Sequence, residues 1–406
     1  MSGNMKKISE KIRDVVLRTM KIESPDIIMG NQAERIRRFI SNGSYSIFSV
    51  GKASIPMVKG LDPVIITNSS LSICLTPSPE NVDGFRVFRG NHPFPDTDTF
   101  RSSDEIFNLI KEDHSDKLIF LLSGGSSSLF EKVSKGVSID RYMEIMHLLV
   151  TGGYPIDQIN SIRCILSDVK CGKMLNHSNY NEILILAISD VPGDDISVIG
   201  SNPFYPGKRF DPDKELTERL GLEKQKITYR DCHIESDIIL AGKKYAGDML
   251  DNIELPYEKV FLENILEGDV NTCSDKILEL LRSRYSKTGK PFVFSAYGET
   301  TSKVTGNGKG GRNCYLSSLI LEKAENSEEF SFISFATDGQ DGNSGLAGFL
   351  VDNTLKEIIS NAEIDRYIEN SDTGNLAIRL HRDLNTGPSG NNVSDVVIGY
   401  YGGNLQ

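Results

Sequence analysis

The sequence predicts an α/β protein whose first domain is doubly wound around a mainly parallel sheet, followed by a second, smaller mixed α/β domain. Two observations support this. The chain has 406 residues, and that length exceeds one ordinary hydrophobic core. Short apolar runs alternate with helical patterns, which is typical of strands joined by crossover helices.

The expected elements begin with an amphipathic helix from Met5 onward. Its apolar residues Ile8, Ile12, Val15 and Met20 recur at helical spacing. Four nearly continuous apolar runs then indicate strands covered on both faces by helices. These runs are residues 47–50, 64–66, 118–122 and 183–188.

A polar stretch at residues 202–236 separates the two expected domains. We therefore assign residues 1–236 to a Rossmann-like α/β domain and residues 237–406 to a mixed α/β C-terminal domain. The second domain has expected strands at 238–241, 260–262, 292–295 and 332–336, a helix at 273–284, and another helix that begins near Asn313.

Composition excludes several classes of protein. A net charge of −11 does not suit a nucleic-acid surface. The six cysteines contain no Cys-x-x-Cys pair, so we expect reduced thiols rather than a zinc site or a disulfide framework. The longest apolar run, 183–188, is too short to span a membrane. We expect a cytoplasmic protein without a membrane partner.

The clearest candidate site is a loop of small residues after the expected strand 118–122. Ser123, Gly124, Gly125 and Ser126 offer backbone amides and hydroxyls at the start of a helix, an arrangement that suits an anion. A plain serine-capped helix explains the same residues equally well.

Charged residues follow two neighbouring expected strands. Lys52 follows the first strand, where it could pair with a carboxylate or a phosphate, although a solvated lysine is the commoner case. Asp190 and Asp194 follow the strand 183–188. Carboxylates there could hold a divalent cation or position a hydroxyl, whereas Asp and Gly also simply favour turns.

Another basic run lies between these two strand ends. Arg163, Ser167 and Lys170 would share one face of a helix at spacings of four and three residues. Such faces are usually just solvated.

The second half contains a Gly-x-Gly-x-x-Gly match at Gly306, Gly308 and Gly311. Alone, it is a weak dinucleotide signal. Lys309 and Arg312 beside it strengthen an anion site, because arginine presents a planar fork of donors.

Other motifs narrow the chemistry. No Gly-x-x-x-x-Gly-Lys-Ser/Thr loop, protein-kinase motif set, histidine metal motif or Gly-x-Ser-x-Gly elbow is present. His92 lies among prolines that fix its backbone and is placed to line a cleft. Asp338 and Asn391, each in a Gly-rich turn near the end of the chain, join the cofactor-binding candidates, with tight turns as the alternative.

Taken in order, these motifs resemble the glycerate 2-kinase family whose C-terminal part is called the MOFRL domain. The resemblance covers most of the chain, and the shared order is specific although each block is weak. The blocks are residues 50–53, 91–96, 122–125, 160–170, 189–194, 298–301, 308–313, 337–342 and 386–388.

The resemblance implies ATP-dependent phosphorylation of D-glycerate on its C2 hydroxyl, with a divalent cation such as Mg²⁺, in a cleft between two domains. It assigns catalysis to Lys52, Asp190 and Arg312, and metal binding to Asp190 and Asp194. Nucleotide binding falls to the following residues: Ser123, Gly124, Gly125, Ser126, Lys170, Asp338 and Asn391.

Three alternatives stay open. An NAD-dependent hydroxypyruvate reductase would use the Gly306–Gly311 match, and a non-catalytic sensor would bind an acidic metabolite without chemistry. The kinase could also act on the C3 hydroxyl, since the choice between adjacent hydroxyls is a matter of pose. A homodimer is compatible with all of these.

Overall fold

The computed structural model describes residues 2–78, 80–191, 193–207, 212–223 and 227–404. Its contacts divide the chain into two compact units. The N-terminal unit is Pro25–Ile239. The C-terminal unit consists of the residues up to Ser24 together with those from Leu240 onward.

The N-terminal unit contains a six-stranded sheet in the order β3-β2-β1-β4-β5-β6, and the pairs from β3 to β5 are parallel. The strands are β1 (Tyr45–Val50), β2 (Ser72–Thr76), β3 (Arg86–Arg89), β4 (Lys117–Leu122), β5 (Glu182–Ser189) and β6 (His233–Ala241). Every residue of β1, β2 and β4 is buried. The predicted doubly wound class is therefore confirmed.

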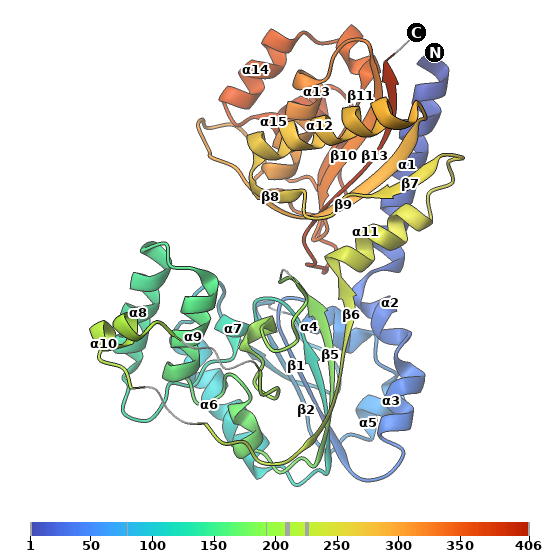
Figure 1. Ribbon diagram of the computed structural model, residues 1–406. Coiled ribbons are helices and arrows are strands. Elements are labelled where there is room, and N and C mark those ends of the chain that lie inside the picture. Colours follow the sequence, from blue (N-terminus) through green and yellow to red (C-terminus); the bar gives the residue numbers. More distant parts are fainter. Residues whose placement is uncertain (1, 79, 192, 208–211, 224–226, 405–406) are drawn as a thin grey trace. The chain divides into compact units, whose positions relative to one another are not determined.

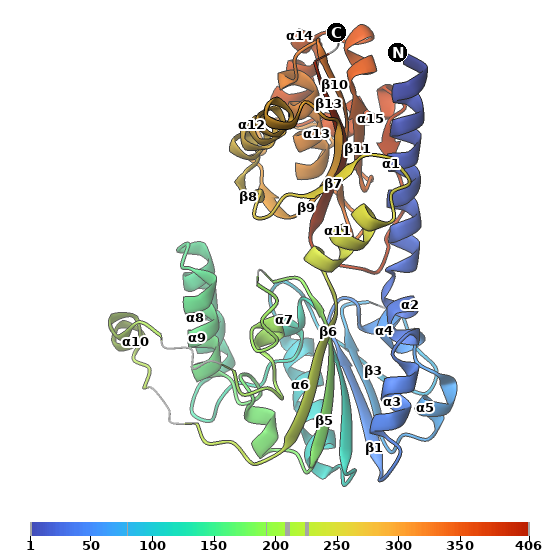
Figure 2. The same ribbon diagram turned by 45° about the vertical axis from the view of Figure 1, so that its right-hand side comes forward.

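Helices cover both faces of this sheet, with α3 and α5 on one side and α6 on the other (Figures 1 and 2). The helices beside the sheet are α2 (Pro25–Gly30), α3 (Ala33–Phe39), α4 (Ser54–Lys59), α5 (Pro63–Thr67), α6 (Thr97–Glu112) and α7 (Ser126–Leu129), with the short turns η1 (Lys173–Asn176) and η2 (Ile199–Ser201).

One predicted strand is wrong. Residues 64–66 belong to helix α5, because the Asp62 side chain accepts a hydrogen bond from Val64 N (2.9 Å) and Pro63 is the first helical residue. The strand that was expected there is β2, which begins at Ser72.

Three further helices of the N-terminal unit form a lobe with its own apolar core: α8 (Ile139–Thr151), α9 (Ile156–Leu166) and α10 (Lys214–Leu220). Because α9 ends at Leu166, the predicted helical face of Arg163, Ser167 and Lys170 does not form. Ser167 instead makes a β-bridge to Val133.

The lobe also corrects the expectation of reduced thiols. Cys164, in α9, forms a disulfide with Cys171, and their Cα atoms lie 5.9 Å apart. The spacing of seven residues between the two cysteines matches no metal or redox motif, so the sequence offered no signal for the pair.

The C-terminal unit is a mixed sheet in the order β12-β11-β10-β13-β9-β7, with β8 also paired to β9. The strands are β7 (Glu258–Phe261), β8 (Leu266–Asp269), β9 (Phe292–Thr301), β10 (Glu328–Ala336), β11 (Gly348–Asp352), β12 (Asp383–Leu384) and β13 (Asp395–Asn404). Strands β7 and β8 are parallel to β9, and the remaining pairs are antiparallel.

Two layers of helices enclose this sheet (Figure 2). One layer contains α12 (Val270–Thr288), α13 (Arg312–Lys323), α14 (Asn361–Glu369) and α15 (Thr373–Arg379), with the turn η3 (Asn353–Glu357). The other contains α1 (Ser2–Ile22) and α11 (Gly242–Asp251).

Helix α1 belongs to the C-terminal unit, whereas the predicted division into 1–236 and 237–406 placed it in the first domain. Its apolar stripe is buried against the C-terminal sheet, and Ser9 Oγ donates to Asp352 Oδ2 (2.8 Å). Residues up to Ser24 therefore complete the C-terminal unit, although they precede the N-terminal unit in the chain.

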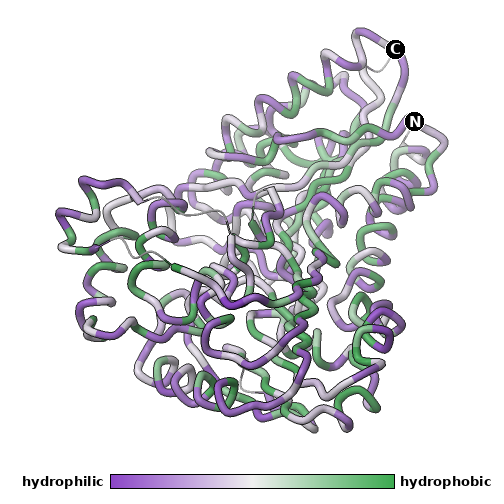
Figure 3. The backbone as a smooth tube through the Cα atoms, turned by 60° about the horizontal axis from the view of Figure 1, so that its bottom comes forward, coloured by the Kyte–Doolittle hydropathy of each residue, from purple (hydrophilic) through white to green (hydrophobic). Residues whose placement is uncertain are grey.

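The apolar cores of the two units follow their sheets, and hydrophobic segments run along the strands in Figure 3. Within the described part of the chain, every helix is too short or too polar to span a lipid bilayer.

Candidate active site

Two loops meet where the strand order of the N-terminal sheet reverses. The order runs from β1 through β2 to β3 on one side and from β4 to β6 on the other, so the carboxyl ends of β1 and β4 flank the switch point. Lys52 N donates to Gly124 O (2.9 Å), and Ala53 N donates to Ser123 Oγ (3.1 Å). Ligands of open α/β sheets bind at this point.

Glycines allow the side chains of Asp190, His92 and Lys52 to approach the second loop. A Cβ added to Gly124 would lie 2.0 Å from Asp190 Oδ2. Gly125 has a φ of +80°, and its added Cβ would lie 3.0 Å from His92 Cδ2 and 3.2 Å from Lys52 Cγ. The structure thus brings the predicted residues Lys52 and Asp190 together around the predicted loop, and His92, which was expected to line a cleft, lies beside the same loop.

His92 lies on a loop that helix α6 holds in place. Asn91 N donates to Thr99 Oγ1 (2.7 Å), and Thr99 donates in turn to Asp96 Oδ1, the cap of α6 (2.8 Å). Burial lowers the pKa of His92 to about 4, and the positive charge of Lys52 acts in the same direction. The imidazole is therefore neutral at pH 7 and can offer one donor and one acceptor.

The helix after the loop begins at Ser126, and no serine side chain caps it. The N-cap residue is Gly125, which makes no side-chain hydrogen bond to the helix. Gly200 makes room for the serine hydroxyl, because an added Cβ there would lie 1.8 Å from Ser126 Oγ. With four residues, α7 has a weak dipole, so an anion here would depend mainly on the backbone amides.

Lys170 lies beneath the loop. It is 0 % exposed, and its ammonium donates to Ser126 O (3.3 Å). Direct binding of a nucleotide by this side chain stays a prediction, while in the structure its hydrogen bond goes to the loop backbone.

Carboxylates follow β5 as the sequence predicted. Asp190 lies against Gly124, and Asp194 occupies a turn with a φ of +50°. Asp195 Oδ1 accepts bonds from Ser197 N (2.9 Å) and Ser197 Oγ (2.6 Å). Pro192 of this motif lies outside the described residues.

A divalent cation fits this set only if phosphate oxygens complete its ligands. Among the described residues, no group of three or more His, Cys, Asp and Glu side chains could hold a metal ion by itself. Magnesium, however, usually takes one or two carboxylates and fills its remaining positions with substrate phosphates and water. Asp190 beside a loop of backbone amides meets that requirement.

The C-terminal unit has a hollow of about 850 Å³. It is formed by the end of β9, the Gly-rich segment, the start of α13 and the turn after β10. Residues on its wall include Thr300, Lys303, Gly310, Arg312 and Asn343.

Arg312, the first residue of α13, is held by two carboxylates. Its Nε and Nη2 donate to Asp395, at 2.5 and 3.2 Å, and Nη1 donates to Glu299. Burial opposes the charge of Arg312, yet the two carboxylates raise its pKa above the ordinary value. Burial raises the pKa of Asp395 to about 7, although Arg312 opposes that shift. The shift of Arg312 indicates a stable ion pair, whereas that of Asp395 points towards the neutral carboxyl. The two hydrogen bonds between them favour a charged Arg312 and an ionised Asp395.

The Gly-rich segment does not offer free amides for a dinucleotide. Three consecutive residues donate to other parts of the unit: Gly308 N to Asn370 O (3.0 Å), Lys309 N to Asp372 Oδ1 (2.8 Å) and Gly310 N to Asn343 Oδ1 (2.8 Å). These three amides are therefore not available to a pyrophosphate, and the structure does not support a dinucleotide site at this Gly-x-Gly-x-x-Gly match.

The backbone amides at the start of α13 are also hydrogen-bonded within the C-terminal unit. Asp341 is buried, and its carboxylate accepts bonds from Asn313 N (2.9 Å) and Cys314 N (2.8 Å). This capping role was missed from the sequence, because Asp341 lies 28 residues after Asn313.

Asp338 and Asn391 both lie in the C-terminal unit. Asp338 Oδ1 accepts a bond from Gln340 N (2.9 Å), which stabilises the turn after β10. Asn391 is buried, and its amide donates to Glu23 O at the end of the first helical segment (3.2 Å). These contacts are structural, and a nucleotide role for either residue stays a prediction.

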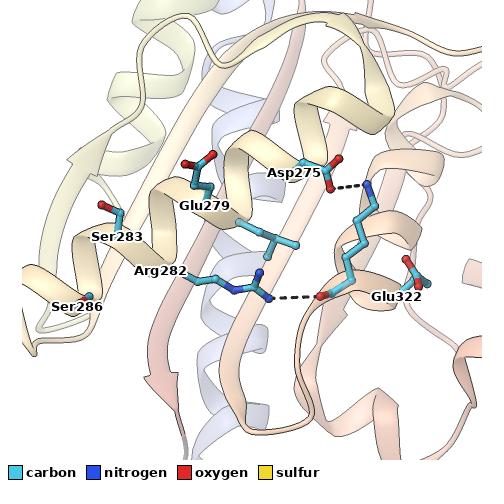
Figure 4. Close-up of a pocket in the computed structure, with 8 residues that line it drawn as sticks. Asp275, Glu279, Arg282, Ser283, Ser286 and Glu322 are labelled. Atoms are coloured by element: carbon cyan, nitrogen blue, oxygen red, sulfur yellow. Dashed lines mark hydrogen bonds and ion pairs between the residues drawn. The ribbon is translucent and has the colours of Figure 1, made fainter.

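A second hollow of about 830 Å³ lies on the outer face of α12 and α13 (Figure 4). Both of its cations are already paired: Arg282 with Glu328 (2.7 Å) and Lys323 with Asp275 (2.7 Å). Among the described residues, its lining comes from α12 and α13 alone, so we do not assign catalysis to this surface.

Comparisons with known proteins agree along most of the chain. Residues 11–231 match the family model described as the domain of unknown function DUF4147, and residues 292–395 match the MOFRL family. The glycerate 2-kinase of Picrophilus torridus is 32% identical over 403 residues, covering 96% of both chains. A putative hydroxypyruvate reductase of Agrobacterium vitis is 27% identical and covers 87% of this chain and 98% of its own.

The fold has a counterpart among solved structures. The crystal structure of a glycerate kinase from Thermotoga maritima superposes with a TM-score of 0.82 at 25% identity. The match covers 98% of this chain and 100% of that chain.

Proposed function

The chain belongs to the glycerate 2-kinase family, and on that premise we propose that it transfers the γ-phosphoryl group of ATP to the C2 hydroxyl of D-glycerate. The products are 2-phosphoglycerate and ADP. The observation that carries the proposal is the pair of hydrogen-bonded loops at the switch point, with Lys52 and Asp190 against the glycines of the second loop.

The N-terminal unit contributes the groups for phosphate. Backbone amides of Gly124, Gly125 and Ser126 cradle ATP phosphates, since small residues allow close approach and no side chain caps the start of α7. The amide of Ser123 donates to Val50 O (3.0 Å), so Ser123 contributes to this loop through its place at the end of β4. Lys52 is exposed at the same loop, where its charge can meet the transferring group. Phosphoryl transfer depends mainly on such positioning and charge neutralisation.

Asp190 has two compatible roles beside Gly124. Its carboxylate can orient the C2 hydroxyl for attack, and with Asp194 it would hold Mg²⁺. When bound, the cation would supply positive charge that offsets the phosphate oxygens.

Arg312 is the catalytic residue that we propose in the C-terminal unit. Its planar guanidinium has five N–H donors, and the pairs with Asp395 and Glu299 use three of them. The rest can bind glycerate carboxylate or the transferring phosphoryl group in the 850 Å³ hollow. An arginine directed at transition-state charge contributes on the order of 1,000-fold in rate. A homodimer and a cytoplasmic location remain proposals that accompany this function.

The test compares two reactions with one preparation. With Mg-ATP and D-glycerate, we expect ADP release that depends on both substrates. With hydroxypyruvate and NADH or NADPH, we expect no change in nicotinamide absorbance, because the amides of Gly308, Lys309 and Gly310 are occupied. Nicotinamide oxidation without ADP release would instead support the reductase named for the Agrobacterium relative. Glycerate binding without either reaction would support a sensor.

A further inference from the structure

A buried charge cluster around Lys170 lies behind the loop of Ser123–Ser126. Lys170 and Glu131 are each 0 % exposed. Burying a charge is costly unless an opposite charge and hydrogen bonds compensate it. We therefore asked which groups offset the cost of burying the Lys170 ammonium next to this loop.

The carboxylate of Glu131 and the ammonium of Lys170 attract each other electrostatically. Its Oε2 accepts a bond from Tyr142 Oη (2.8 Å), and its Oε1 has no hydrogen-bond partner among the described residues. Burial lowers the pKa of Lys170 to about 8; the charge of Glu131 opposes this shift, and Arg163 adds to it. Burial raises the pKa of Glu131, and Lys170 lowers it.

Helix α7, which lies between the sheet and α9 in Figure 1, is held near both ends by hydrogen bonds. Lys170 donates to the carbonyl of Ser126, the first residue of α7. Glu131 follows the last residue of α7 by two positions, and its backbone N donates to Ser103 Oγ (2.9 Å). The orientation of the loop amides thus depends on groups that do not reach the loop surface.

We infer that Lys170 and Glu131 are positioning residues for phosphoryl transfer. The ammonium of Lys170, kept charged by Glu131, fixes the Ser126 carbonyl and thereby aims the amides of the Ser-Gly-Gly loop at the nucleotide phosphates. The inference rests on the proposed function, because it assumes that this loop binds ATP.

The pH dependence of the KM for ATP tests the inference. In the wild type, we expect this KM to rise as the pH increases through about 8, where Lys170 loses its proton. Glu131 and Arg163 act on Lys170 directly, while Tyr142 and Lys173 act on Glu131. In Glu131→Gln the opposing anion is gone, so the rise should begin about one pH unit lower.

A double variant guards against misfolding. Glu131→Gln with Lys170→Met leaves no unpaired buried charge, and such replacements often keep a protein folded. We expect a folded protein with a KM for ATP raised about tenfold and a flat pH profile above pH 7.5, because no ammonium then remains to titrate.

Lys173→Met is the matched control. Lys173 is also buried, but its ammonium donates to Cys164 O (2.7 Å) and Ser167 O (2.5 Å), away from the loop. Lys173→Met should lower the melting temperature, and its KM for ATP should rise at the same pH as that of the wild type.

The outcomes separate two kinds of failure. If the wild type forms no phosphoglycerate, the proposed function fails. If the wild type is active, but Glu131→Gln and the double variant keep its pH profile and KM for ATP while changing only the melting temperature, the pair is structural and the inference is wrong.

Discussion

At the scale of single residues, the two predicted catalytic cations have different surroundings. Lys52 is exposed beside Gly125, whereas Arg312 is held by Asp395 and Glu299. A substitution at Lys52 can therefore report on chemistry alone. A substitution at Arg312 must also disturb a buried pair.

Lys52→Ala should lower kcat/KM about 10- to 100-fold, because it removes one charged hydrogen bond to a phosphate or carboxylate. Lys59→Ala, on the next helix and paired with Glu80, is the control and should retain wild-type kinetics. Steady-state ADP release measures both, with circular dichroism to verify folding. Wild-type turnover by Lys52→Ala at all substrate concentrations would contradict the assignment.

Arg312→Ala should lower the free energy of unfolding by about 2 kcal/mol as well as the activity, because Asp395 is left buried without its partner. Adding Asp395→Asn should recover part of that stability and none of the activity. Urea titration and ADP release separate the two effects. Recovery of turnover in the double variant would show that Arg312 acts only as a structural partner of Asp395.

Residues that function through sequence neighbours could be predicted, and those that function through distant partners could not. Lys52, Gly124 and Asp190 follow apolar strands directly, and parallel strands bring their carboxyl ends to one edge. Asp341 and Asp395 act on residues that lie 28 and 83 positions away. Glu131 does not follow a strand, and its proposed role depends on Lys170, which lies 39 positions later in the sequence, so the sequence alone did not predict it.

At the scale of elements, the loop of Ser123–Ser126 needs its glycines, because a side chain at Gly124 or Gly125 would collide with neighbouring side chains. Three of the four continuous apolar runs in the first half were correctly predicted as strands, namely those of β1, β4 and β5. The 64–66 run failed because Asp62 and Pro63 start a helix, and local capping outweighed β propensity.

Gly124→Ala should reduce turnover by at least about tenfold, because the new methyl group would occupy the position of the Asp190 carboxylate. Gly247→Ala, in α11, is the matched control: no atom lies within 4 Å of its added Cβ, and alanine favours a helix. ADP release and thermal melting test both variants. Equal activity of the two would show that the Gly124–Asp190 contact has no role in catalysis.

At the scale of the whole molecule, the chain is not divided at one point. The first helix precedes the N-terminal unit and packs on the C-terminal sheet, so the C-terminal unit requires both ends of the sequence. The amphipathic stripe was readable from the sequence. The sheet that it covers was not, because many sheets present an apolar face.

Ile12→Ala tests that packing. Ile12 is 0 % exposed in α1, and the cavity left by its truncation should cost about 2 to 4 kcal/mol. Hydrogen exchange should then accelerate in β10 and β13 and stay unchanged in β1 and β4, which belong to the other unit. Leu17→Ala, in the same helix but 40 % exposed, is the control. Faster exchange in β1 and β4 alone would contradict the division into units.

The most direct test of the central claim is phosphorus NMR of the product formed from Mg-ATP and D-glycerate. Transfer to C2 places phosphate on a carbon with one hydrogen, and we predict a product signal split into a doublet by that proton. With Lys52→Ala and substrate concentrations below KM, the signal should grow about 10- to 100-fold more slowly. A triplet, from phosphate on the C3 methylene, or the absence of any new phosphate ester would contradict the account.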